Sequence, residues 1–496
     1  MSTRERFFLI AILGAHLALT VWLSAVLNIW VDEAYTLHTT SLSVADTARQ
    51  ALTWEVQPPL YFVLINFWRQ LGSGIFFVRL FSVIAVAVGV YIAGLVASGY
   101  VSERSRFWVM AVVAFNPFVI ASAIEARVYG LVFLWSALLM WLFYLGYMHE
   151  GRSVLARVGF AVVAALALYT QYYTGFLLLG FAAALVFQRR WRDFAVFVGS
   201  MVLVGTSFIP VAVYVRSEIA TNSINFANPS GFFGNLIHVV QILVLDLLPV
   251  DWAGTTARHV MYLIVFLLLT IVLWRSGKAS LKSLVANSAT ILVVAVILFT
   301  AAATIAHQPL SSHYLDAFHL PAFMVLFGSL ASLRGGAGQR SIVIAAAVLV
   351  VLSAFSNAND YRTLAKYGDW LRVSAFISAR ESNNQRIVVF DAQSALPLAY
   401  YYRGKNSIVP LPHAMRFDRY DLHDNALHDQ SEVTSALGYI PRANTELWLV
   451  TSNGCRRAPV NFHCEQLDDF VARNYKTLLD QHFEGTRVRL LREKQL

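Results

Sequence analysis

The feature that most constrains this chain is a succession of apolar runs, each close to the length that crosses a lipid bilayer. A hydrocarbon core about 30 Å thick needs about 20 apolar residues in a helix that rises about 1.5 Å per residue. The first run, residues 7–29, meets that length directly after the polar start MSTRER. With 57% hydrophobic and only 14% charged residues, the 496-residue chain could not cover a soluble surface with polar groups. The sequence therefore predicts an α-helical polytopic membrane protein.

Further apolar runs bring the predicted number of membrane spans to about eleven. They lie near residues 75–98, 107–123, 127–147, 158–170, 174–188, 194–214, 259–274, 287–305, 315–333 and 341–356. Every second connection is basic, and by the positive-inside rule those connections face the cytoplasm. An odd number of spans then leaves the amino terminus in the cytoplasm and the polar tail from residue 357 outside.

The net charge of +9 does not indicate nucleic acid as a partner. The basic residues stand in short loops between apolar runs, whereas a nucleic-acid surface gathers them in one stripe with interleaved aromatics. We therefore interpret them as signals of membrane topology.

The only two cysteines, Cys455 and Cys464, both lie in the tail that we place outside. That compartment is oxidising in bacteria and in the secretory lumen, and the spacing is compatible with a short-loop disulfide. Two free surface thiols are the alternative. The chain contains no Asn-x-Ser/Thr glycosylation site, which favours a bacterial inner membrane.

We expect two domains, a transmembrane domain over residues 1–356 and an outer α/β domain over residues 357–496. Within the first, residues 30–73 form a long outer loop whose apolar periodicity predicts two amphipathic helices separated by Pro58-Pro59. A second outer loop, residues 215–259, contains the apolar stretch LIHVVQILVLDLLPV, which is short for a span and predicts a re-entrant or interfacial segment. In the tail, the runs RIVVFD, ELWLV and RVRLL predict strands.

Ionisable residues are scarce in the middle of the predicted spans and gather at their outer ends. They are Asp32, Glu33, Arg79, Glu125, Arg127, Arg216, Arg258, His307 and His313. Such groups are functional candidates in a membrane protein because their desolvation is costly. A proton-coupled transporter would keep carboxylates near the midplane, so this pattern favours a cavity at the outer surface.

The adjacent carboxylates Asp32 and Glu33 suit chemistry in which one accepts a proton and the other orients a partner or raises its basicity by like charge. A helix cap at a membrane boundary is the alternative. Arg127, in IEARVYG, has a permanently charged, planar guanidinium group that suits the binding of phosphate. The alternative is that it anchors the helix end at the membrane interface. The further candidates for the cavity are Glu55 and Gln57 in WEVQPPLYF, Glu125, and Gln171 and Tyr172 in QYYTG.

We predict no metal site among the histidines His307, His313 and His319. No pair of them has tight ligand spacing with matching carboxylates, so ordinary polarity at the membrane interface explains them better.

Five segments in order, WVDEAYTL, QPPLYFVLINFW, EARVYGLVFL, TQYYTGFLLL and SSHYLDAFHLPAF, resemble the bacterial protein mannosyltransferase and aminoarabinose transferase group of the GT-C superfamily. The resemblance covers roughly the first 330 residues, more than one ordinary domain. It implies a glycosyltransferase that uses a polyprenyl-phosphate sugar, with Asp32 as base and Glu33 as its partner. It also implies that Arg127 and Tyr129 contact the donor phosphate, with His313 and Tyr314 behind them.

The chain departs from the pattern of that group at three positions. Gln57 precedes the double proline where histidine is common, and Gln171 stands where the group often has HYY. Both departures weaken a metal site, so a divalent cation is not firmly implied. His313 stands where an arginine often precedes the tyrosine, which makes phosphate binding depend more on Arg127.

We therefore expect inverting sugar transfer from a polyprenyl-phosphate donor in the membrane to a hydroxyl on a glycan, lipid or protein acceptor at the outer face. A transporter of a lipid or small molecule is the alternative, and a sensor whose tail binds ligand is the next. The sequence does not indicate which sugar is carried, and it leaves the oligomeric state open.

Overall fold

The structure is a computed structural model, and it divides into two compact units. Unit 1 comprises Met1–Ala25, Gln57–Arg216 and Asn228–Asp360, and unit 2 comprises Val26–Val56, Ser217–Ala227 and Tyr361–Leu496. The residues that the structure describes are 2–149, 151, 153–225, 230–263, 284–308, 310–333, 337–437, 446–452 and 460–494. Each unit is considered by itself.

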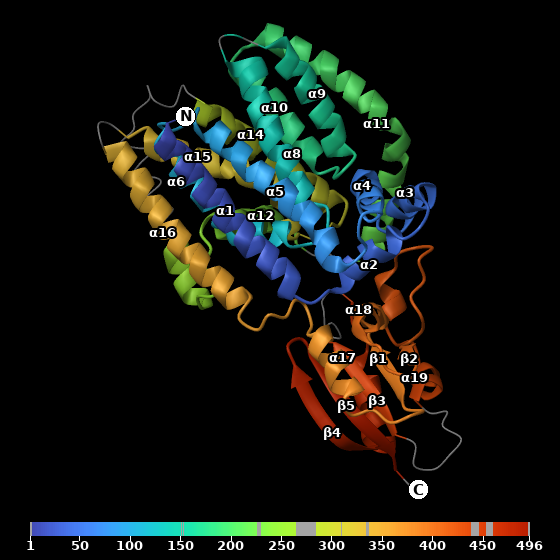
Figure 1. The fold of residues 1–496 in the computed structure, drawn as a ribbon. Coiled ribbons are helices and arrows are strands. Elements are labelled where there is room, and N and C mark those ends of the chain that lie inside the picture. The colour runs from blue at the N-terminus through green and yellow to red at the C-terminus, as the bar shows by residue number, and fades with distance from the viewer. Residues whose placement is uncertain are drawn as a thin grey trace. The chain divides into compact units, whose positions relative to one another are not determined.

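Unit 1 is built from apolar helices (Figure 1). Within the described residues, seven are long and apolar enough to cross a membrane. They are α1 (Thr3–Val26), α5 (Ile75–Ala97), α8 (Tyr129–Phe143) with its continuation η1 (Tyr144–Met148), the first part of α11 (Trp191–Asn225), α14 (Leu284–Ile305), η3 (Ser312–Phe318) with α15 (His319–Ala331), and α16 (Ala337–Asp360). The prediction of a polytopic helical membrane protein is confirmed.

The predicted span over residues 107–123 is broken rather than straight. It consists of α6 (Arg106–Phe115) and α7 (Pro117–Ala123), which meet at an angle of 61°. The cause is local, because Asn116 adopts an extended backbone and caps α7 through its side chain, while Pro117 cannot donate the hydrogen bond that would continue α6.

Three other apolar helices are shorter than a bilayer crossing. They are α9 (Val154–Leu168), α10 (Thr174–Phe187) and α12 (Phe232–Leu247). The first two correspond to the predicted spans 158–170 and 174–188, and α12 contains most of the stretch that the sequence predicts to be too short to cross. Most of the predicted span 259–274 lies outside the described residues. The number of eleven spans therefore stays a prediction.

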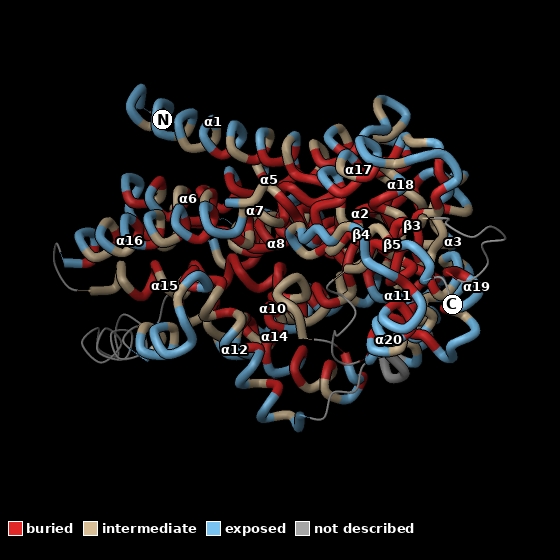
Figure 2. Tube along the Cα trace, turned by 90° about the horizontal axis from the view of Figure 1, so that it is seen from below, coloured by how far each residue is buried: buried red, intermediate tan, exposed pale blue. Residues whose placement is uncertain are grey.

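Close helix packing in unit 1 depends on small residues. A Cβ atom on Gly180 of α10 would lie 2.5 Å from the carbonyl oxygen of Ile291 in α14, and these two helices are neighbours. Small residues that let backbones approach are the usual means of packing helices in lipid, where burial of apolar side chains gives no driving force. By contrast, α1 and α16 contain many exposed residues (Figure 2), and several of them are apolar, such as Ile10, Ile344 and Phe355.

The first long loop differs from its prediction in two ways. It contains three helices, α2 (Val31–Thr39), α3 (Val44–Thr53) and α4 (Leu60–Trp68), rather than two. The expected break at Pro58-Pro59 is present, and α4 begins directly after it. The loop is also divided between the units, since residues up to Val56 belong to unit 2 and those from Gln57 belong to unit 1. We had assigned the whole of residues 30–73 to the transmembrane domain.

Unit 2 contains a five-stranded mixed sheet of order β2-β1-β3-β5-β4. The strands are β1 (Arg386–Phe390), β2 (Ile408–Pro410), β3 (Glu446–Ser452), β4 (Tyr475–Phe483) and β5 (Thr486–Glu493). β1 pairs in parallel with β2 and β3, whereas β5 is antiparallel to β3 and β4. The three strands predicted from RIVVFD, ELWLV and RVRLL are β1, β3 and β5, so the small α/β domain is confirmed.

The central strands are buried continuously, and because successive side chains point to opposite faces, both faces of the sheet are covered by helices. On β1, Val388 and Phe390 face one core, whereas Ile387 and Val389 face the other. The first core is completed by α19 (Gln430–Leu437) and α20 (Cys464–Asn474), and the second by α17 (Trp370–Ser378) and α18 (Ala395–Tyr401).

Cys464 begins α20, is buried, and is disulfide-bonded. The other cysteine of the chain, Cys455, lies outside the described residues, so the pairing of the two stays a prediction.

Candidate active site

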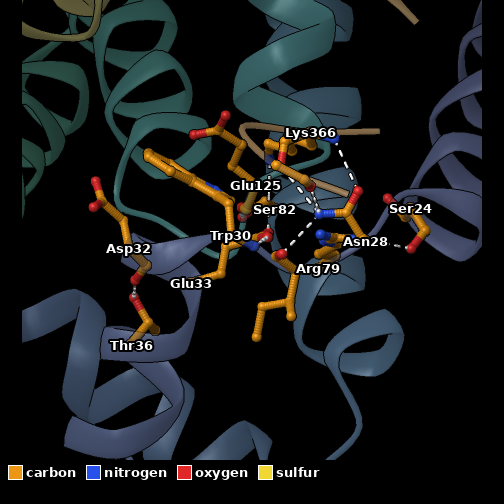
Figure 3. Close-up of polar contacts among 12 residues, drawn as sticks. Ser24, Asn28, Trp30, Asp32, Glu33, Thr36, Arg79, Ser82, Glu125 and Lys366 are labelled. Carbon is orange, nitrogen blue, oxygen red and sulfur yellow. Dashed lines mark hydrogen bonds and ion pairs between the residues drawn. The ribbon is translucent and has the colours of Figure 1, made fainter. Parts of the chain in front are cut away.

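The two adjacent carboxylates lie in the first turn of α2 but have different surroundings. Asp32 is half-buried, whereas Glu33 is fully buried. The Glu33 side chain accepts a hydrogen bond of 3.4 Å from the backbone N–H of Trp30 and so forms part of a capping box. Consecutive helix positions are about 100° apart around the axis, so the two side chains diverge (Figure 3). The helix-cap alternative therefore describes Glu33.

Glu33 has a partner that the sequence did not predict. The Nζ atom of Lys366 lies 3.7 Å from Glu33 Oε1, and both side chains are buried. The same ammonium group lies 5.5 Å from the centre of the Trp30 ring. A buried carboxylate that faces a buried ammonium has its charge balanced. Glu33 is thus placed to hold α2, rather than to raise the basicity of Asp32 by like charge.

The segment around Lys366 is fastened to the start of α2 by backbone contacts as well. Asn28 Nδ2 donates to the carbonyl oxygens of Lys366 and Gly368 at 3.0 and 2.6 Å, and the Lys366 N–H donates to Asn28 Oδ1 at 2.9 Å. The rings of Trp30 and Tyr367 are 4.5 Å apart. Gly368 has φ +124°, a conformation that favours glycine. Because Asn28 and Lys366 are 338 residues apart, no spacing in the sequence connects them.

Two further contacts hold α2 along its length. Tyr35 is buried, and its hydroxyl donates to Gln393 Oε1 at 2.8 Å. Burial raises the pKa of Tyr35 well above its ordinary value, and the charges of Tyr420, Asp32, Asp391 and Glu55 raise it further, so the hydroxyl keeps its proton. Glu55 in turn accepts a hydrogen bond of 2.9 Å from Thr39 at the end of α2. Asp32 and Glu55 therefore both lie close enough to Tyr35 in unit 2 for their charges to act on its hydroxyl.

The candidates for phosphate binding belong to unit 1. Arg127 lies between α7 and α8 and is only 7% exposed, so it does not extend along a surface as an interfacial anchor would. Its guanidinium carbon lies 6.0 Å from the centre of the Phe62 ring. Tyr129 stacks on His313, with ring centres 4.2 Å apart and planes 13° apart. The structure thus brings together Tyr129 and His313, which are distant in sequence.

The neighbouring candidates are also in unit 1. The Glu125 side chain is buried, and its carbonyl oxygen accepts a bond of 2.7 Å from the Ser82 hydroxyl. Tyr314 packs against Tyr173, which lies beside Tyr172.

Gln57 and Gln171 lie in segments that meet. Leu60 N–H donates to the Tyr169 carbonyl oxygen at 3.0 Å, which joins the start of α4 to the turn before α10. Among the described residues, the buried side-chain oxygens of Gln57 and Gln171 accept no hydrogen bond. A buried polar atom without a partner costs about 1–3 kcal/mol. This part of unit 1 therefore holds unmet hydrogen-bonding capacity.

Unit 1 also buries His319, for which the sequence analysis predicts interface polarity, together with two aspartates. His319 Nε2 lies 2.5 Å from Asp246 Oδ2, and its Nδ1 lies 3.6 Å from Asp316 Oδ1. The carbonyl oxygen of Asp246 accepts a bond of 2.6 Å from Asn116. For His319, interface polarity is thus corrected, because its ring is enclosed between two aspartates. The available signal was Asp246 itself, a lone carboxylate in an apolar stretch.

Within the part of the chain that the structure describes, no group of three or more His, Cys, Asp or Glu residues is arranged to hold a metal ion. Arg79, one of the ionisable residues singled out from the sequence, is buried in unit 1, and its Nη1 donates to the carbonyl oxygen of Ser24 at 3.0 Å (Figure 3).

No protein-family model matches the chain, and no curated protein matches it. Its fold does match solved structures. The crystal structure of ArnT, the aminoarabinose transferase, from Cupriavidus metallidurans bound to undecaprenyl phosphate aligns with 99% of this chain and 98% of that one, at a TM-score of 0.59 and 12% identity. The chain has the GT-C fold. The apo form of ArnT matches over 97% of both chains, at a TM-score of 0.56 and 12% identity.

The GT-C fold covers both units, including the C-terminal residues beyond the reach of the sequence resemblance. It confirms the predicted fold class. At 12% identity the match concerns the fold, and the roles of individual residues are argued below from their own surroundings.

Proposed function

We propose that this membrane protein is an inverting glycosyltransferase that moves a sugar from a polyprenyl phosphate to an acceptor hydroxyl at the outer face of the membrane. Two lines support the proposal: the GT-C fold that it shares with ArnT, whose crystal structure contains undecaprenyl phosphate, and the ordered motifs of the first 330 residues, roughly two domain lengths. The bacterial inner membrane is the proposed location, with the amino terminus in the cytoplasm and residues 357–496 outside.

The observation that carries the proposal is the division of roles between Asp32 and Glu33. A general base needs a carboxylate that substrate can reach, held at a fixed position. Asp32 is half-buried on a helix whose start is fastened by buried Glu33, Lys366 and Asn28. Asp32 is therefore the base, and Glu33 and Lys366 are positioning residues.

The chemical step is a single displacement at the anomeric carbon. The acceptor oxygen attacks that carbon, its proton passes to the Asp32 carboxylate, and the bond from the anomeric carbon to the phosphate oxygen breaks with its electron pair on the phosphate. The leaving phosphate is a stable anion, so no general acid is required. One displacement inverts the configuration.

Stabilisation of the leaving phosphate is assigned to Arg127, with Tyr129, His313 and Tyr314 beside it. A buried guanidinium is a strong partner for phosphate because its planar fork donates two parallel hydrogen bonds and keeps its charge. The Tyr129–His313 stack supplies further hydrogen-bonding groups. No step is routed through a metal ion, although a divalent cation could assist the same phosphate.

The proposed function is tested by Asp32→Asn in the full-length protein. The assay follows the release of polyprenyl phosphate from a panel of polyprenyl-phosphate hexoses and pentoses, together with envelope extracts as acceptors. We expect turnover to fall by about a hundredfold to ten-thousandfold, the usual contribution of a general base, with an unchanged melting temperature.

The matched control is Asp46→Asn, which changes an exposed carboxylate in the first turn of the neighbouring helix α3. It should keep full turnover. Retained turnover in Asp32→Asn would remove the base assignment, and loss of turnover in both variants would show a non-specific effect of charge on the loop.

A further inference from the structure

Unit 1 contains a cavity of about 490 Å³ that the proposed reaction does not use. It lies between the start of α1, the start of α6 and the start of α16. Its lining combines arginines and a glutamine with aromatic and aliphatic side chains of two apolar helices.

The cavity carries a net positive charge, since two arginines and one glutamate line it. Arg4 and Arg104 both line it, and in the described ranges neither forms an ion pair or a side-chain hydrogen bond with a carboxylate. Glu5 also lines it, and its carboxylate accepts the Ser2 N–H at 2.8 Å. The neighbouring Arg106 is already paired with Glu103 at 3.0 Å and does not line the cavity. Two free guanidinium groups attract an anion.

The rest of the lining suits the apolar part of an amphiphile. Phe8 and Ile12 come from α1, and Trp108 and Ala111 come from α6. Phe8 and Trp108 are 40% and 41% exposed, and the guanidinium carbon of Arg4 lies 5.7 Å from the Phe8 ring. Tryptophan beside arginine is typical of the boundary between lipid head groups and acyl chains.

The cavity is separate from the candidate active site. Arg79 at the start of α5 bonds to the end of α1 at Ser24, and Ser82, one turn further along α5, bonds to Glu125. The phosphate-binding candidates therefore lie at the end of these helices where α5 begins. The cavity is lined by the start of α1 and by Arg104, which follows the end of α5. It therefore lies at the opposite end of α1 and α5 from the phosphate-binding candidates.

We propose that this cavity binds the phosphate head group of an anionic glycerophospholipid, with the acyl chains along Phe8, Ile12 and Trp108. The two arginines bind the phosphate, and the exposed apolar faces of α1 and α6 contact the chains. A free phosphate ion would leave the apolar lining exposed to water. A lipid can contact both the arginines, through its phosphate, and the apolar lining, through its acyl chains. This proposal does not depend on the proposed reaction.

The experiment measures lipid binding to the full-length protein in detergent by native mass spectrometry. Phosphatidylglycerol is titrated against phosphatidylcholine with the same acyl chains, for the wild type, Arg4→Gln, Arg104→Gln and the double variant. One basic residue near a lipid surface contributes about a fivefold effect, so we expect about fivefold weaker binding of phosphatidylglycerol for each single variant and about twenty-five-fold for the double variant. Phosphatidylcholine binding should not change.

Arg106→Gln is the matched control, because it removes the same charge two residues from Arg104 but outside the cavity. It should bind phosphatidylglycerol as the wild type does. An equal loss in Arg106→Gln would reduce the effect to overall charge and overturn the site. Three other results would also overturn the proposal. The wild type could bind both lipids equally, or inorganic phosphate could compete fully with phosphatidylglycerol. Undecaprenyl phosphate at a stoichiometric amount could also displace phosphatidylglycerol.

A second measurement does not depend on charge. Phosphatidylglycerol with brominated acyl chains should quench more tryptophan fluorescence in the wild type than in Trp108→Phe. Equal quenching would show that the chains do not reach the cavity.

Discussion

In unit 2 a buried lysine faces a buried glutamate, whereas in unit 1 a histidine lies between two buried aspartates. The opposite charges of Glu33 and Lys366 lie 3.7 Å apart. His319 Nε2 lies 2.5 Å from Asp246 Oδ2 and its Nδ1 lies 3.6 Å from Asp316 Oδ1, so two carboxyl groups share one imidazole ring. The first arrangement pairs one positive group with one negative group, whereas the second places two carboxyl groups around one histidine ring.

This comparison teaches that the two units bury ionisable groups for different purposes. The Glu33–Lys366 pair of unit 2 connects segments that are distant in sequence, and in the proposed function it positions Asp32. The cluster of unit 1 joins α12 to α15 and to η3, which also carries His313. Removing a charge should therefore affect the two units to different extents.

The largest effect is expected for His319→Ala, which leaves two buried carboxylates facing each other. Breaking a buried ion pair costs about 3–5 kcal/mol, and repulsion between two aspartates should exceed that range. Thermal unfolding in detergent measures the loss. His238→Ala, on an exposed face of the same helix as Asp246, is the control and should melt as the wild type does. A wild-type melting temperature for His319→Ala would remove the distinction between the units.

Next in size is Lys366→Met, which leaves one buried carboxylate and should destabilise by about 3–5 kcal/mol. The double variant Glu33→Gln/Lys366→Met should recover most of this loss, because it leaves no buried charge. If the pair is positional, kcat should fall in both variants while the KM for the donor stays constant. A double variant as unstable as the single one would show that the lysine acts by packing alone.

A smaller effect is expected from packing in unit 1. Gly180→Ala places a Cβ atom 2.5 Å from a backbone oxygen of α14, which cannot give way as a flexible side chain would. Overpacking of this kind costs about 1–3 kcal/mol. Gly205→Ala, on α11, meets nothing within 4 Å and should be neutral or slightly stabilising. Similar unfolding of the two variants would show that α10 and α14 do not rely on close approach.

The smallest effect concerns His38, at the end of α2, whose ring stacks on Phe417 at 3.5 Å. Burial lowers the pKa of His38 below its ordinary value of 6.5. The unfolded chain then binds the proton more readily than the folded one, so stability should decrease as the pH falls below 6.5 and level off below the folded pKa. His38→Phe keeps the stack and should flatten this dependence between pH 5 and 7, near the ordinary histidine pKa. An identical pH profile for the variant would assign the dependence elsewhere.

Much of the fold could be predicted because local patterns specify it. The long apolar runs specified the helices of unit 1, and strand patterns specified β1, β3 and β5. The bend at Asn116 and Pro117 was missed because an apolar run reads as continuous when only hydropathy is counted. The third helix of the first loop was missed because α2 and α3 are separated by only a few residues, Thr40–Ser43.

For the candidate site, the sequence predicted several of the residues but not the residues that they contact. Asp32 and Arg127 stood out because charged residues are scarce in this chain. The pairing of Glu33 with Lys366 could not be predicted, and although Asp246 was conspicuous in its apolar stretch, its contact with His319 depends on how the chain folds back. The pairing of Tyr129 with His313 also required the fold.

By itself, the sequence determined that this chain is a multi-helix membrane protein with a polar α/β tail, because hydropathy and strand alternation act over short stretches. It also determined where charged groups stand relative to those stretches. Only the tertiary structure decided that Glu33 supports α2 while Asp32 remains half-buried, and that His319 lies between two aspartates. The physical reason is that a buried charge must be balanced by whichever group the fold brings within a few ångströms, and that group can be hundreds of residues away.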